Sequence, residues 1–132
     1  MNNPKTKGIH DVNKVIMDKE KEFLEKLEEA YQTYDASVVE DYLAEDMHYA
    51  SMWVFYEMTS KEEYINYLKG KLETMKRTHK KMEFEIVKGR RNAHALLVTN
   101  ERSPERVPFG FVADFNDDGK VSMLNITIQD FF

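Results

Sequence analysis

The sequence contains no cysteine, which excludes a disulfide framework, a thiol nucleophile and the sulfur-rich zinc sites. It also lacks internal repeats, linkers and low-complexity tracts. No apolar run reaches the length of a membrane span, and residues 1–17 contain neither a continuous apolar segment nor a small-residue cleavage site. These absences predict a cytoplasmic protein with no membrane partner.

What the chain does contain suits one globular domain of 132 residues. Hydrophobic residues make up 42% of it and charged residues 33%, which is typical of a soluble protein. Its eight Phe, seven Tyr and one Trp suit a lined cavity as well as a packed core. The formal net charge of −5 gives no basis for a nucleic-acid partner.

The chain opens with a polar stretch and then becomes helical. Residues 1–11 are predicted to form a flexible arm, and residues 12–132 a single domain. From about Asp11 to Tyr34, apolar side chains recur at helical spacing, which predicts a long first helix.

Two more helix starts are marked by a serine followed three residues later by a glutamate, the pattern of a capping box. Ser37 with Glu40 predicts a second helix, and Ser60 with Glu63 predicts a third. The aromatic segment between them, residues 46–58, lacks helical periodicity and is predicted as a strand or a short hairpin.

After the third helix the apolar period changes to two. Residues 82–88, 93–101, 109–115 and 120–128 each alternate in the way that strands do. The expected fold class is therefore α+β, with three N-terminal helices packed on an antiparallel sheet, rather than a βαβ fold.

One stretch near the end resembles a calcium-binding loop. Asp114, Asn116, Asp118 and Gly119 have the spacing with which an EF-hand loop begins. An EF-hand lies between helices, however, and these flanks alternate like strands, while Asn125 occupies the position of the bidentate glutamate. Because Asp-Gly tolerates the positive φ of tight turns, the stretch predicts a hairpin.

Three stretches resemble the nuclear-transport-factor-2-like superfamily, particularly its SnoaL-like branch. Residues 27–49 resemble its first two helices and the entry to its first strand, residues 59–69 its third helix, and residues 107–128 its last hairpin. The resemblance covers roughly residues 12–130. It implies a cystatin-like cone, in which a strongly curved sheet wraps around the long helix and leaves a pocket open at one end.

The same resemblance implies a homodimer formed through the outer face of the sheet. The residues support a covered outer face independently, because apolar side chains occur on both faces of the last two strands. Val112 lies on the second face of one strand, and on the other Val121 and Met123 lie opposite Leu124, Ile126 and Ile128.

Enzymes of this superfamily hold a carboxylate base in an apolar cone, with a tyrosine or a protonated acid at the developing oxyanion. If Asp46 follows the second helix as in the isomerase-like members, the base position falls at or next to Ser51, and residues 48–54 contain no carboxylate. The candidate catalytic residues are therefore His48 as a substitute base, Asp46, and Tyr31 as an oxyanion donor.

The expected pocket lining comes from aromatic and polar side chains on the first helix and the strands. Each has a structural alternative, because aromatic side chains also pack a core and strand histidines are commonly structural. The residues are Tyr31, Tyr34, His48, Trp53, Tyr56, His94 and Asn125.

No metal or other cofactor is expected. Glu45, Asp46 and His48 lie close in sequence and His94 could approach them, but no metal-binding spacing supports a site. The basic cluster at residues 76–81 lies at a helix end without interleaved aromatics, and is interpreted as a solvated face.

These observations favour a SnoaL-like domain that binds a small apolar or amphipathic molecule in its cone, with no assignable catalysis. One alternative is an enzyme of the isomerase, cyclase or dehydratase kind, with a His or Asp base and a Tyr oxyanion donor. A second is a dimeric protein-interaction module whose cone is packed shut by its own side chains.

Overall fold

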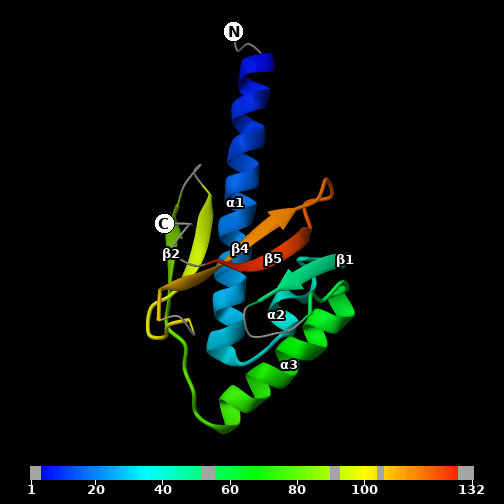
Figure 1. Ribbon diagram of the computed structural model, residues 1–132. Coiled ribbons are helices and arrows are strands. Elements are labelled where there is room, and N and C mark those ends of the chain that lie inside the picture. Colours follow the sequence, from blue (N-terminus) through cyan, green and yellow to red (C-terminus); the bar gives the residue numbers. More distant parts are fainter. Residues whose placement is uncertain (1–3, 52–55, 90–92, 104–105, 128–132) are drawn as a thin grey trace.

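A computed structural model describes residues 4–51, 56–89, 93–103 and 106–127 of the protein, with side chains from residue 18 onward (Figure 1). Helices lie against one face of a curved five-stranded sheet, which confirms the α+β cone predicted from the sequence. In order, the elements are α1 (Pro4–Thr33), α2 (Ser37–Glu40), β1 (Leu43–Ala50), α3 (Lys61–Arg77), β2 (Phe84–Lys88), β3 (His94–Val98), β4 (Phe109–Phe115) and β5 (Val121–Thr127).

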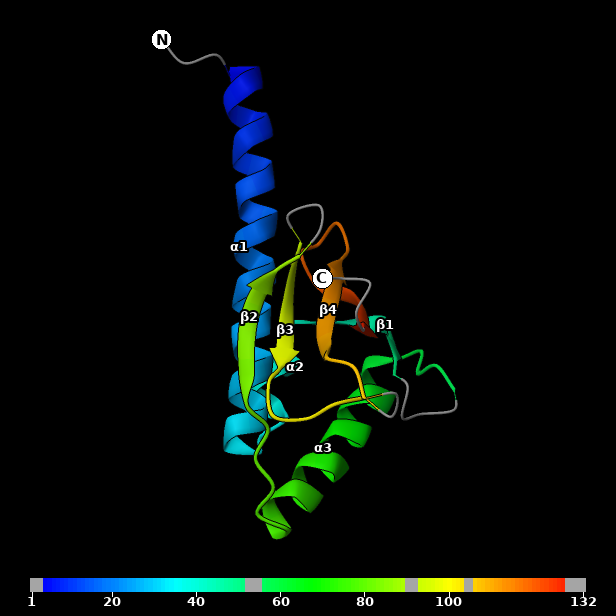
Figure 2. The same cartoon turned by 60° about the vertical axis from the view of Figure 1, so that its left-hand side comes forward.

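Helix α1 is longer than the sequence predicted. It begins at Pro4, so residues 4–10 are helical where a flexible arm was expected, and its N-terminal part extends beyond the sheet (Figures 1 and 2). Proline is well tolerated at a first helical position, because the missing N–H would have no intrahelical partner there. Apolar periodicity could not reveal this segment, since residues 4–10 contain a single large apolar side chain, Ile9.

The capping box predicted at Ser37 is wrong. The N-cap of α2 is Ala36, and it makes no side-chain capping bond. Instead, Asp35 Oδ1 accepts hydrogen bonds from the Ser37 N–H at 3.0 Å and from Ser37 Oγ at 2.7 Å. A charged carboxylate is a stronger acceptor than a hydroxyl, so the Asp35 side chain accepts the hydrogen bonds at this turn.

The predicted start of α3 is confirmed. Ser60 is its N-cap, and Ser60 Oγ accepts a hydrogen bond from the Glu63 N–H at 3.1 Å. The expected apolar stripe is buried and consists of Tyr64, Ile65, Leu68, Leu72 and Met75. In Figure 2 this helix crosses below the sheet, away from the projecting end of α1.

The strands lie in the order β1-β5-β4-β3-β2. Strands β2 to β5 pair antiparallel, as predicted, whereas β1 pairs parallel with β5 and places His48 opposite Met123. The sequence did not predict this parallel pair. Along the chain, α3 and three further strands separate β1 from β5, and a parallel pair needs a long connection of this kind. Tyr49 also bridges antiparallel to Met58, so the two ends of the aromatic segment approach as in a hairpin.

The hairpin predicted between β4 and β5 is confirmed. Asn116 Oδ1 accepts hydrogen bonds from the N–H groups of Asp118 and Lys120, both at 3.0 Å. Gly119 has φ +76°, the left-handed conformation that glycine adopts without steric cost. Asn116, one of the apparent calcium ligands, therefore orders a turn.

The core lies between α1, α3 and the concave face of the sheet. Aromatic rings fill much of it, with Tyr31 packed 5.8 Å from Phe111 and 5.3 Å from Phe84 between ring centroids. The largest fully buried side chains are Tyr49, Tyr64, Phe23, Phe109, Phe111, Leu24, Leu27, Met47, Leu68, Leu72, Leu96 and Leu124. Within the described part of the chain, no helix has the length and apolar character needed to cross a membrane.

Candidate functional site

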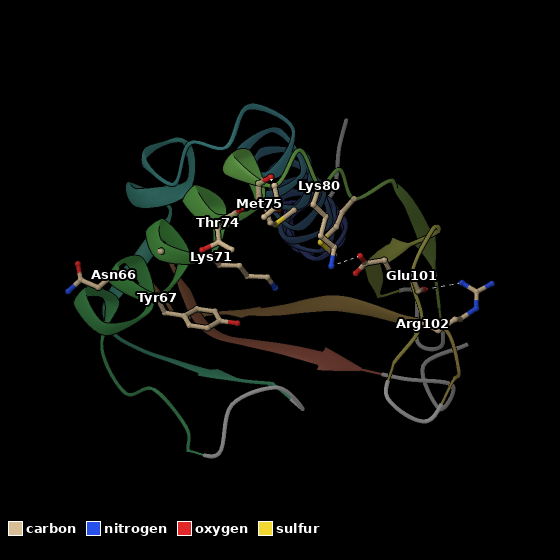
Figure 3. A pocket seen from close by; sticks show the side chains of 11 residues that line it. Asn66, Tyr67, Lys71, Thr74, Met75, Lys80, Glu101 and Arg102 are labelled. Atoms are coloured by element: carbon tan, nitrogen blue, oxygen red, sulfur yellow. Dashed lines mark hydrogen bonds and ion pairs between the residues drawn. The ribbon is translucent and has the colours of Figure 1, made fainter.

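A cavity of about 910 Å³ lies beside α3 (Figure 3). One wall is the face of α3 that carries Asn66, Tyr67, Gly70, Lys71, Thr74 and Met75. The other wall comes from the segment between α3 and β2, with Thr78, Lys80 and Met82, and from the loop after β3, with Glu101 and Arg102. Its volume falls within the range of sites for small molecules, which run from roughly 300 to 1,000 Å³.

The α3 wall follows from helical spacing. Tyr67, Lys71, Thr74 and Thr78 recur at intervals of three and four residues, so they form a stripe beside the buried apolar stripe. Gly70 lies in this wall, and a Cβ atom added there would meet nothing within 4 Å. The missing side chain therefore leaves open space in the middle of the helix face.

Lys71 extends from α3 toward the middle of the cavity (Figure 3). Its Nζ lies 5.4 Å from the centroid of the Tyr31 ring, a distance at which a cation is attracted to an aromatic face. Burial lowers the pKa of Lys71 from its ordinary value to about 8, while Glu101 opposes this shift and Lys80 adds to it. An ammonium in this position is poorly hydrated, so it favours an added negative charge.

The opposite rim carries an ion pair. Lys80 Nζ lies 2.8 Å from Glu101 Oε1, and the Arg102 guanidinium donates to the Glu101 backbone carbonyl at 3.0 Å (Figure 3). Asn100 fixes this loop to the segment before β2, because its amide accepts from the Glu83 N–H and donates to the Lys81 carbonyl, both at 2.9 Å. The rim therefore consists of two segments that the Asn100 hydrogen bonds hold together.

Behind the α3 wall lies a group of tyrosines. The Tyr67 ring packs 5.5 Å from Tyr49 and 6.5 Å from Tyr64, and those two lie 4.8 Å apart. The hydroxyls of Tyr49 and Tyr64 are buried, and the Tyr49 hydroxyl lies within hydrogen-bonding reach of Ser51 and Tyr67. Burial raises the pKa of both hydroxyls, so they remain neutral donors.

Two expected pocket residues, Tyr31 on α1 and Tyr34 directly after it, lie near this cavity without lining it. Tyr31 is 2% exposed and belongs to the core, and its ring faces the cavity-lining Lys71. Tyr34 Oη donates to the Lys80 carbonyl at 2.9 Å, and its ring lies 4.6 Å from Lys81 Nζ. Both tyrosines therefore support the cavity wall from behind.

His48 and Asn125 lie on the opposite face of the sheet. Their strand neighbours Met47, Tyr49 and Leu124 face the core, so alternation turns His48 and Asn125 outward. Asp46 is exposed. The structure thus does not bring His48 or Asp46 together with Tyr31, as the isomerase-like arrangement requires.

The His48 side chain contacts a glutamate at the surface. Its Nδ1 lies 2.9 Å from Glu57 Oε2, and both side chains are 43% exposed. Tyr56, another expected pocket residue, is 64% exposed, and Trp53 lies outside the described residues.

His94 has a structural partner on α1. Glu20 Oε1 lies 2.8 Å from His94 Nδ1 and accepts from the His94 backbone N–H at 2.7 Å. In the part of the chain that the structure describes, no three His, Asp or Glu side chains converge as a metal site would require.

Sequence reasoning missed Lys71 and Tyr67, which the structure places at the centre of the site. The signal was present in the stripe of Tyr67, Lys71, Thr74 and Thr78 along α3, interrupted by Gly70. A lysine on a mixed stripe of this kind is usually solvated, so its inward direction required knowledge of what packs opposite the helix.

No protein-family model matches the chain, and no curated protein matches its sequence. Solved structures do match its fold. A SnoaL-like protein of unknown function from Burkholderia thailandensis has a TM-score of 0.63 and 14% identity, over 85% of this chain and 95% of that one.

Two further structures show how different the proteins with this fold are. A steroid delta-isomerase from Pseudomonas aeruginosa has a TM-score of 0.58 and 13% identity, over 84% of this chain and 80% of that one. A de novo designed protein with a curved β-sheet has a TM-score of 0.55 and 15% identity, over 86% and 84% of the two chains. At these identities the likeness concerns the fold, and the protein has the SnoaL-like, nuclear-transport-factor-2-like fold.

Proposed function

We propose that the protein binds a small apolar or amphipathic molecule in the cavity beside α3, with no assignable catalysis. The observation that carries this proposal is the cavity itself, about 910 Å³ in volume. Its lining combines apolar surface from Tyr67, Met75 and Met82 with polar and charged side chains, of which Lys71 extends toward the middle (Figure 3). That combination is the usual composition of a small-molecule site.

The enzymatic alternative is supported only by the likeness of the fold to a steroid delta-isomerase. One fold carries many functions, so the argument must come from the site. His48 and Asp46, the candidate bases, lie away from the cavity, and Tyr31 is buried behind Lys71. A binding role therefore fits the described residues better than an isomerase or cyclase does. An open cavity also argues against an interaction module with a closed cone.

A thermal-shift screen tests the proposal, with steroid-like, terpenoid and polyketide-like compounds against the wild-type protein. Compounds that bind in the cavity should raise the melting temperature of the wild type and not that of Gly70→Leu. The added leucine occupies the open space beside α3, where a Cβ meets nothing within 4 Å. Gly70→Ala is the matched control and should keep the response. The proposal fails if no compound stabilises the wild type, or if Gly70→Leu responds equally.

We further propose a homodimer that forms through the outer face of the sheet and acts in the cytoplasm. Its support is the apolar character of that face, where Leu97, Val112 and Met123 point away from the core and are half-buried. Light scattering at micromolar concentration should give twice the chain mass of 15.6 kDa. Val112→Glu should reduce it to the monomer mass. A wild-type protein that is already monomeric contradicts the dimer.

A further inference from the structure

We propose that the cavity takes a singly charged amphipathic anion whose carboxylate head lies between the Lys71 ammonium and the Tyr67 hydroxyl. This inference rests on the proposed function, since it names the chemical class of ligand that the same cavity would bind. Three features carry it: the sign of the lining charge, the hydrogen-bonding character of the α3 wall and the apolar surface beyond it.

The lining charge is positive although the protein as a whole is acidic. Lys71, Lys80 and Arg102 line the cavity against one carboxylate, Glu101, while the chain has a formal net charge of −5. Lys80 and Glu101 pair with each other at the rim, and the Arg102 side chain points away from the centre (Figure 3). Lys71 reaches the middle, where poor hydration of its ammonium strengthens the attraction for an anion.

Two hydrogen-bond donors of the α3 wall point into the cavity, the Lys71 ammonium and the Tyr67 hydroxyl (Figure 3). The Tyr67 hydroxyl points into the same space as Lys71 (Figure 3), and the buried hydroxyls of Tyr49 and Tyr64 lie behind its ring. An ammonium only donates, whereas a carboxylate only accepts and offers two oxygens. A carboxylate can accept from both the Lys71 ammonium and the Tyr67 hydroxyl, whereas the N–H of an amide or the O–H of an alcohol finds no acceptor on the ammonium.

The remaining lining limits the charge and accommodates an apolar body. Lys71 offers one positive charge at this position, and Thr74 and Thr78 lie at the C-terminal end of α3, where the negative helix dipole opposes any anion, so the α3 wall balances one negative charge at most. Met75 and Met82 supply adaptable apolar surface beside the head-group position. A monoanion with an aromatic or aliphatic body fits this arrangement, and a phosphate dianion does not.

The test compares naphthylacetate with naphthylacetamide by isothermal titration, because the two share one body and differ in the charge of the head. Decanoate and decanol form a second pair with an aliphatic body. Each pair is titrated into the wild type, Lys71→Met and Lys71→Arg. Lys69→Met is the matched control, because Lys69 is exposed on the same helix and does not line this cavity. Circular dichroism establishes that every variant is folded.

We expect the acid to bind the wild type and Lys69→Met about tenfold or more tightly than the amide, as for a well-placed charge pair. Lys71→Met should lose this difference, and Lys71→Arg should retain part of it. The acid affinity should also fall as the pH rises past about 8, because Lys71 then loses its proton, while the amide affinity stays constant.

Equal affinity of acid and amide for the wild type overturns the inference but leaves the proposed function standing, since a ligand still binds. An acid preference that survives in Lys71→Met places the head group elsewhere and also overturns it. If neither pair binds and the thermal-shift screen finds no ligand, the proposed function itself fails.

Discussion

Lys71 Nζ lies 5.4 Å from the centroid of the Tyr31 ring, so a lysine of α3 directs its charge at a buried aromatic residue of α1. Burial lowers the pKa of Lys71 from 10.5 to about 8, against the opposing effect of the Glu101 carboxylate. Because burial disfavours the charged form, a ligand that brings a negative charge beside Lys71 would stabilise its ammonium.

The first prediction concerns the stability of Lys71→Met. Below about pH 8 the lysine is protonated in both the folded and the unfolded state, so the full penalty of burying its charge is present. As the pH rises toward 10.5 the folded protein releases the proton first, and the penalty is relieved. Lys71→Met should therefore be more stable than the wild type by about 1–3 kcal/mol near neutral pH, discounted for the open side of the cavity.

Urea denaturation across this pH range measures the difference, which should shrink steadily above about pH 8. Lys69→Met should differ from the wild type by less than about 0.5 kcal/mol at every pH, as is usual for exposed sites. A destabilised Lys71→Met at neutral pH would show that Lys71 makes a net favourable interaction.

The second prediction concerns Glu20 on α1. Its Oε1 accepts from the His94 backbone N–H at 2.7 Å, and the two side chains are 14% and 11% exposed. Glu20→Ala leaves this donor buried without its acceptor, so the free energy of unfolding should fall by about 1–3 kcal/mol. Glu20→Gln keeps an acceptor oxygen and should lose less.

Glu25→Ala, an exposed position on the same helix, is the control and should change stability little. If Glu20→Ala unfolds at the same denaturant concentration as the control, the Glu20–His94 contact contributes nothing to the fold.

The third prediction is that two glycine substitutions have opposite signs. Gly70 lies inside α3 with open space beside it, so Gly70→Ala should stabilise the protein by up to about 1 kcal/mol through helix propensity. Gly119 has φ +76° in the β4–β5 turn, and Gly119→Ala should destabilise it by about 1 kcal/mol or more. Thermal unfolding of both variants measures the two changes in stability. Changes in the same direction would contradict the backbone conformations of Gly70 and Gly119.

The fourth prediction separates the two serines that have the same sequence pattern. Ser60 caps α3 through the Glu63 N–H, so Ser60→Ala should lower the free energy of unfolding by about 1 kcal/mol. Ser37 is exposed, and Asp35 provides the acceptor at its turn, so Ser37→Ala should cost clearly less. If Ser37→Ala lowers the free energy of unfolding more than Ser60→Ala does, Ser37 rather than Ser60 makes the important capping contact.

The fold was largely predictable because its signals are local. The Ser60 cap, the apolar stripe of α3 and the turn at residues 116–120 each depend on residues within a few positions of one another. The parallel pairing of β1 with β5 was not predictable, since nothing within either strand specifies a partner so distant in sequence.

The candidate site was much less predictable, for two physical reasons. Alternation along a strand shows that His48 and Met47 face opposite ways, but only the packed sheet reveals which face is inward. The cavity depends on the distance between α3 and the loop at Glu101, two segments separated by two strands. The aromatic side chains expected to line a pocket instead fill the core, as Tyr31 does.

The most direct test of the binding site is a titration of Lys71 itself, followed by NMR at its Cε and Nζ. In the free protein the account predicts a pKa lowered to about 8 by burial. Saturating naphthylacetate should raise the pKa toward the ordinary value of 10.5, because the carboxylate stabilises the ammonium, and naphthylacetamide should leave it unchanged. A Lys71 pKa near 10.5 without ligand, or a Lys71 pKa that saturating naphthylacetate does not change, contradicts the account.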